Sequence, residues 1–63
     1  MDNEKELKNL AITLISQYGD DAEAVAMLRA AEYAAELNNK EWLKWERVVS
    51  LINEIGKNPD LDG

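Results

Sequence analysis

The 63-residue sequence contains no cysteine, no histidine and no phenylalanine, and only one proline. Without cysteine there is no disulfide framework, and without cysteine and histidine the usual ligands of structural zinc are missing. We therefore expect no metal site and no cofactor. A chain of this length buries only roughly 60% of the surface of its unfolded state, so its hydrophobic core is marginal. Because no covalent or metal link adds stability, oligomerisation is the remaining common way to stabilise it.

Positive charge is also scarce, with seven basic residues against thirteen acidic ones and a net charge of -6. This charge repels phosphate backbones and anionic lipid headgroups, so we expect no direct binding to nucleic acid and no membrane partner. No apolar run approaches the length of about 18 residues that spans a bilayer, and the first residues lack the basic and apolar regions of a signal peptide. The sequence predicts a cytoplasmic protein.

The sequence shows no catalytic constellation. Nucleophilic catalysis needs a hydroxyl or thiol beside a base, and no histidine is present to activate a hydroxyl. The chain is therefore not expected to be an enzyme. Its aliphatic hydroxyl side chains are Thr13, Ser16 and Ser50.

Apolar residues recur at helical spacing along the chain, and nowhere do they alternate as they would in a strand. Asn3 and Asn38 are predicted to cap two helices, Asp20 or Asp21 a third, and Gly19 to end the first. The fold class is predicted as all-α, an up-down-up three-helix bundle with a single domain over residues 1–56 and a flexible C-terminal tail over 57–63. The helices are expected at about 3–18, 21–37 and 40–55.

The middle segment, Asp21 to Leu37, is unusually apolar and contains seven alanines. A helix that is apolar around most of its circumference belongs in a core or an interface. On a helical wheel its main stripe, expected to be covered by the first and third helices, is Ala24, Met27, Leu28, Ala31, Ala34 and Ala35. Its second row, expected to need another chain, is Ala26, Ala30, Tyr33 and Leu37.

These observations predict a small, non-catalytic protein–protein interaction module that forms a homodimer through the second and third helices. Small alanines allow a neighbouring backbone to approach closely, and tryptophans near a helix end are good interface anchors. Trp45, at the centre of the stripe on the third helix, is assigned to the core. The predicted interface consists of Ala26, Ala30, Tyr33, Leu37, Trp42 and Leu43.

Two other functions are compatible with the same composition. In the first, the protein is a phage or mobile-element inhibitor, such as an anti-CRISPR protein, whose acidic surface occupies a groove that normally binds nucleic acid. In the second, it is a small regulatory subunit that becomes ordered against a larger protein. The acidic residues that would act in the inhibitor are Asp20, Asp21, Glu23, Glu32 and Glu36.

Parts of the sequence resemble a group of short, uncharacterised helical proteins found in alphaproteobacteria and their phages. The similar residues are the run 11–22 (AITLISQYGDDA), the run 29–32 (RAAE) and the run 45–49 (WERVV) with Ile52. The resemblance covers about residues 6–55 and implies a small helical domain. The Asn38-Asn39 pair stands where those proteins have a Gly-Asp turn. The resemblance assigns no site residue.

Overall fold

The computed structural model describes residues 4–57, which form helices and contain no strand. The all-α class predicted from the sequence is confirmed. The predicted cap at Asn3 and the tail beyond Lys57 lie outside the described residues. The helical elements are α1 (Glu4–Tyr18), the 3₁₀ turn η1 (Gly19–Asp21), α2 (Ala22–Ala35) and α3 (Asn39–Lys57).

Helix α1 buries one narrow stripe and ends where the sequence predicts. Leu7, Ala11 and Leu14 are buried and follow the spacing of i, i+4 and i+7 that places side chains on one helix face. Gly19 follows the helix with a φ of 58°, in the left-handed region that glycine adopts without steric cost. The chain therefore leaves α1 through the residue that is best suited to the turn.

The start of α2 differs from the prediction. Asp21 occupies the N-cap position of α2, but its side chain makes no capping hydrogen bond, and no side-chain cap precedes η1 either. The backbone of η1 continues into α2 instead, and the N–H of Ala22 donates to the carbonyl of Gly19. The prediction that Asp20 or Asp21 caps the second helix through its side chain is therefore wrong.

The turn between α2 and α3 contains a leucine in an unusual conformation. The N–H of Leu37 donates to the carbonyl of Ala34 at 3.0 Å, and that of Asn38 donates to the carbonyl of Tyr33 at 2.9 Å. These two bonds define a Schellman motif, whose left-handed position is usually glycine. Here the position is Leu37, with a φ of 60° and 83% of its surface exposed. Asn38 then caps α3 as predicted, since its Oδ1 accepts the N–H of Glu41 at 3.3 Å.

Substituting Leu37 by glycine is expected to stabilise the fold. A left-handed residue with a Cβ costs about 1–2 kcal/mol, and the extra freedom that glycine has in the unfolded chain offsets part of this gain. We expect Leu37→Gly to raise the free energy of unfolding by about 0.5–1 kcal/mol, measured by urea titration at micromolar concentration. Leu37→Ala is the matched control, because it removes the side chain but keeps the Cβ. An equal gain in both variants would show that the backbone conformation carries no cost.

Helix α3 continues to Lys57, two residues past its predicted end at about residue 55. Gly56 lies inside the helix, and its φ is not positive. A glycine weakens a helix but ends it only where the chain needs the left-handed conformation, and nothing at this position requires that. The boundary predicted near Ile55 is therefore corrected by two residues.

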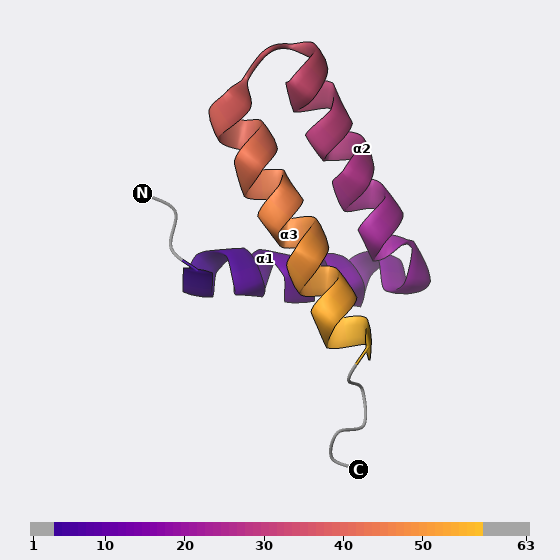
Figure 1. Ribbon diagram of the computed structural model, residues 1–63. Helices are drawn as coiled ribbons and strands as arrows, with labels where there is room; N and C mark the ends of the chain where they lie inside the picture. Colours follow the sequence, from indigo (N-terminus) through magenta and orange to yellow (C-terminus); the bar gives the residue numbers. More distant parts are fainter. Residues whose placement is uncertain (1–3, 58–63) are drawn as a thin grey trace.

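The three helices do not form an up-down-up bundle. Figure 1 shows α2 and α3 side by side as an antiparallel hairpin, whereas α1 runs across the end of the hairpin that is farther from the loop joining α2 and α3. The buried stripe of α1 packs against the C-terminal half of α3, at Val48, Leu51 and Ile52. Spacing along a helix shows which face is apolar but leaves the crossing angle open, and several crossing angles are common.

The core lies where α1 meets the hairpin, and it is small. Four of its nine buried residues are alanines, and Val48 is the only large side chain among the described residues that is fully buried. Trp45 is partly buried and packs against this core, in keeping with its prediction. The buried residues are Leu7, Ala11, Leu14, Ala22, Ala26, Ala30, Val48, Leu51 and Ile52.

Candidate binding surface

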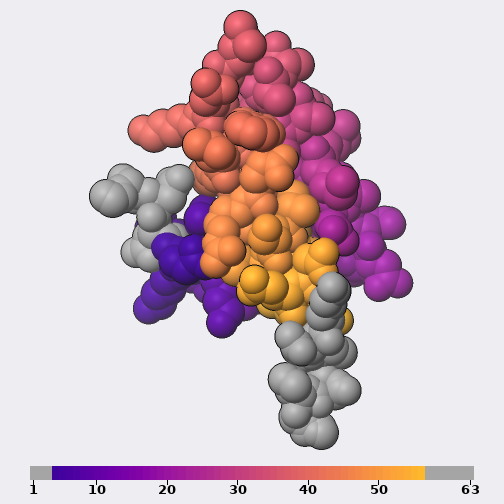
Figure 2. Space-filling model, viewed as in Figure 1, coloured from indigo at the N-terminus to yellow at the C-terminus, as the bar shows by residue number. Residues whose placement is uncertain are grey.

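The side of α2 that faces away from α3 is apolar and uncovered. Met27 is 54% exposed and Leu28 is 61% exposed, although both are large apolar side chains. Exposed alanines surround them along the helix. Figure 1 shows no other helix of the described chain on this side of α2, and α2 forms one edge of the molecule in Figure 2. We name this surface the outer face of α2 and define it as Ala24, Met27, Leu28, Ala31, Ala34 and Ala35.

The opposite side of α2 is made of small residues that are packed inside the protein. Ala22 is 1% exposed, Ala26 is 0% exposed and Ala30 is 3% exposed. Side chains advance by about 100° per residue around a helix, so this row lies roughly opposite Leu28 and Ala31. Small residues here let the backbone of α2 approach α3, whose side chains are larger.

In the structure, the two apolar rows of α2 therefore have the opposite roles to those predicted. The main stripe, expected in the core, is the exposed outer face, and Ala26 and Ala30, expected in an interface, are in the core. Burial makes both alanines inaccessible to another chain, so their assignment to the interface is corrected. The large side chains of α3, such as Trp45, pack best against small neighbours, and this signal could have identified the buried row from the sequence.

The remaining residues of the predicted interface lie around the turn between α2 and α3. Leu37 is 83% exposed and Leu43 is 60% exposed, while Tyr33 and Trp42 are half-buried. The core around α1 does not include this end of the hairpin. These four residues are thus only partly covered by the fold, but they do not lie on the outer face.

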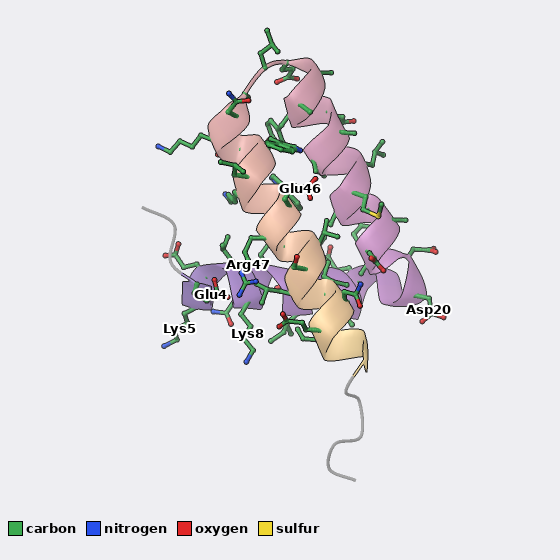
Figure 3. The ribbon with its side chains drawn as sticks, in the orientation of Figure 1. Glu4, Lys5, Lys8, Asp20, Glu46 and Arg47 are labelled. Carbon is green, nitrogen blue, oxygen red and sulfur yellow. The ribbon has the colours of Figure 1, made fainter. Side chains whose placement is uncertain are left out.

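The acidic residues considered for groove mimicry do not form one surface. Asp20 and Asp21 lie in η1 and Glu23 in the first turn of α2, whereas Glu32 lies in its last turn and Glu36 directly follows the helix. A rise of about 1.5 Å per residue separates Glu23 from Glu36 by about 20 Å along the helix. Glu32 also has a cationic neighbour, since one of its oxygens is 4.0 Å from Nη1 of Arg29. Asp20 points away from the other labelled side chains in Figure 3.

An open groove of about 530 Å³ lies between the end of α1, η1 and the C-terminal part of α3. Its lining includes three isoleucines, two carboxylates and one amide. It shares Ile52 with the core, and it lies at the end of the molecule where α1 crosses the hairpin. The residues lining it are Ile15, Gly19, Asp20, Glu23, Ile52, Asn53, Ile55 and Gly56.

One ion pair ties α1 to α3 on the surface. The Nε of Arg47 donates to the two carboxylate oxygens of Glu4 at 3.1 and 3.2 Å, and Nη2 also donates to this carboxylate (Figure 3). The hydrogen bond from Arg47 lowers the pKa of Glu4 below its ordinary value and raises that of Arg47. Both side chains are exposed, and exposed pairs contribute little to stability. The pair joins the first turn of α1 to α3 at the surface.

Within residues 4–57, no three acidic side chains come close enough together to hold a metal ion. None of the helices in that range is both long and apolar enough to cross a bilayer. In comparisons with known proteins, the chain matches no family model, no curated protein and no solved structure. The resemblance to short bacterial proteins therefore stays a prediction.

Proposed function

We propose that this chain is a small, non-catalytic protein-interaction module that binds through the outer face of α2. The observation that carries the proposal is the exposure of Met27 and Leu28 along a helix side that has no polar residue. Isolated apolar residues are common on protein surfaces, but a contiguous apolar strip along a helix is typical of a binding surface. The strip faces away from the helices that form the core.

The composition of the core supports the same proposal. Alanine contributes little apolar area, and four of the nine buried residues are alanines. Two larger apolar side chains of α2, Met27 and Leu28, lie outside the core. They would be buried, and so add to the stability of the protein, only on contact with a partner. Association thus supplies the stabilisation that the sequence requires in the absence of disulfide and metal. A partner with an apolar helix face of its own fits this surface best.

A photo-cross-linking experiment tests the proposed surface. Benzoylphenylalanine is introduced at Leu28 on the outer face, and separately at the exposed Asn9 of α1, in cells that make the protein. We expect a discrete cross-linked product from position 28 and none from position 9. Equal products from both positions, or none from position 28, would contradict the proposal. The mass of the product identifies the partner as a second copy or as a larger protein.

A further inference from the structure

The residues of the outer face of α2 are spaced so that two copies of this helix can pack against each other. Ala24, Leu28, Ala31 and Ala35 follow one another at spacings of four, three and four residues. This is the spacing of the seam along which two helices pack in a coiled coil. All four residues are exposed in the described chain, and Leu28, at 61% exposed, is the one large side chain among them.

We propose that the occupant of this surface is a second copy of the chain, with the two α2 helices antiparallel and related by a two-fold axis. The inference rests on the proposed function and specifies its partner. When residue 28 of one helix lies level with residue 31 of the other, residue 24 lies level with residue 35. Leu28 then packs against the partner's Ala31 on both sides of the axis, and Ala24 against the partner's Ala35. Each large side chain meets a small one, which gives dense packing at a short distance between helices.

The flanks of the seam also fit this register. Arg29 and Glu32 lie on the same side of the seam, and their side chains are 56% and 54% exposed. Within one copy, Nη1 of Arg29 is 4.0 Å from Oε1 of Glu32. In the antiparallel arrangement each Arg29 lies about 1.5 Å along the axis from the partner's Arg29 and about 3 Å from the partner's Glu32, so the two glutamates offset the repulsion between the two arginines. On the other flank Met27 lies beside the partner's Ala34. A parallel pair would instead place Leu28 beside the partner's Leu28, so that two large side chains meet.

Disulfide cross-linking tests the register directly, because the chain has no cysteine of its own. Ala24→Cys and Ala35→Cys are prepared as separate variants, each at an exposed position of α2. Within the proposed dimer, position 24 lies level with the partner's position 35 but about 16 Å along the axis from the partner's position 24. We therefore expect an oxidised dimer from the mixture and little from either variant alone. A dimer formed equally by Ala24→Cys alone would overturn the antiparallel register.

Mass measurement with a matched pair of variants tests the self-association itself. Leu28 on the outer face and Leu43 on α3 are 61% and 60% exposed, so lysine at either position disturbs the core equally little. We expect the unmodified chain and Leu43→Lys to sediment as dimers at about 100 µM in 0.5 M NaCl, where salt screens the net charge of -6. Leu28→Lys is expected to sediment as a monomer with unchanged helical circular dichroism.

The outcomes separate the two proposals. If the unmodified chain is monomeric under these conditions but position 28 cross-links to a different protein in cells, the self-pairing is wrong and the binding surface stands. If the chain is monomeric and position 28 gives no product, both are wrong. If Leu43→Lys dissociates the dimer and Leu28→Lys does not, the interface is at the turn between α2 and α3 and the outer-face dimer is wrong.

Discussion

Ala26→Leu is expected to lower the free energy of unfolding by at least about 1–3 kcal/mol, because it inserts three carbon atoms where α2 packs inside the protein. Ala26 is 0% exposed, and overpacking a closed site forces side chains off their rotamers or moves the backbone. A chain of 63 residues is stable by only about 3–9 kcal/mol. The substitution therefore removes a large share of the total stability.

Ala34→Leu is the control for this change. It introduces the same side chain into the same helix, and leucine has nearly the helix propensity of alanine. Ala34 is exposed, so we expect the free energy of unfolding to change by less than about 0.5 kcal/mol. Urea titrations followed by circular dichroism at low micromolar concentration compare the variants. Destabilisation by Ala34→Leu without destabilisation by Ala26→Leu would mean that α2 has the rotation predicted from the sequence.

Val48→Asp is expected to have the largest effect of any change considered, and to leave the chain unfolded at neutral pH. Val48 is 0% exposed and lies at the centre of the core that α1 shares with α3. A carboxylate at this position would lose its hydration, and within the described chain the nearest arginine in sequence, Arg47, is already paired with Glu4 on the surface. An unpaired buried charge costs several kcal/mol, which is comparable to the whole stability of the fold.

Ser50→Asp separates the effect of burial from that of composition. Ser50 is exposed on the same helix, so the variant has the same added charge and a similar loss of helix propensity without the loss of hydration. We expect it to keep the circular dichroism at 222 nm and the cooperative thermal transition of the unmodified chain, while Val48→Asp loses both. A cooperative transition in Val48→Asp would contradict the position assigned to Val48 in the core.

Local features were predicted well because their causes are local. The capping of α3 by Asn38 needs only one side chain and a backbone N–H three residues later, and the end of α1 needs only the left-handed freedom of Gly19. The exceptions are also local. Leu37 takes a left-handed position that glycine usually holds, and Gly56 stays helical because nothing there requires a turn.

The uncovered face of α2 was predicted only in part. The sequence contains both apolar rows of α2, and the excess of apolar surface correctly indicates that one face is left uncovered. Leu28 and Met27 are the larger residues, so assigning them to the core is the natural choice on burial alone. In the structure the row of small alanines is buried instead, because α3 contributes bulky residues such as Trp45 to the core. Two helices with large side chains on both facing rows cannot approach each other as closely as two helices of which one has a row of small residues.

By itself, the sequence determines that this protein is helical, where its helices begin and end to within a few residues, and that α2 has more apolar surface than two neighbours can cover. These properties follow from the period of 3.6 residues, from caps and turns, and from the small size of the chain. Only the tertiary structure decides how α2 is rotated about its axis and that α1 crosses the hairpin. Periodicity fixes the angles between the rows of one helix, whereas the rotation of that helix depends on how the side chains of three helices fit together.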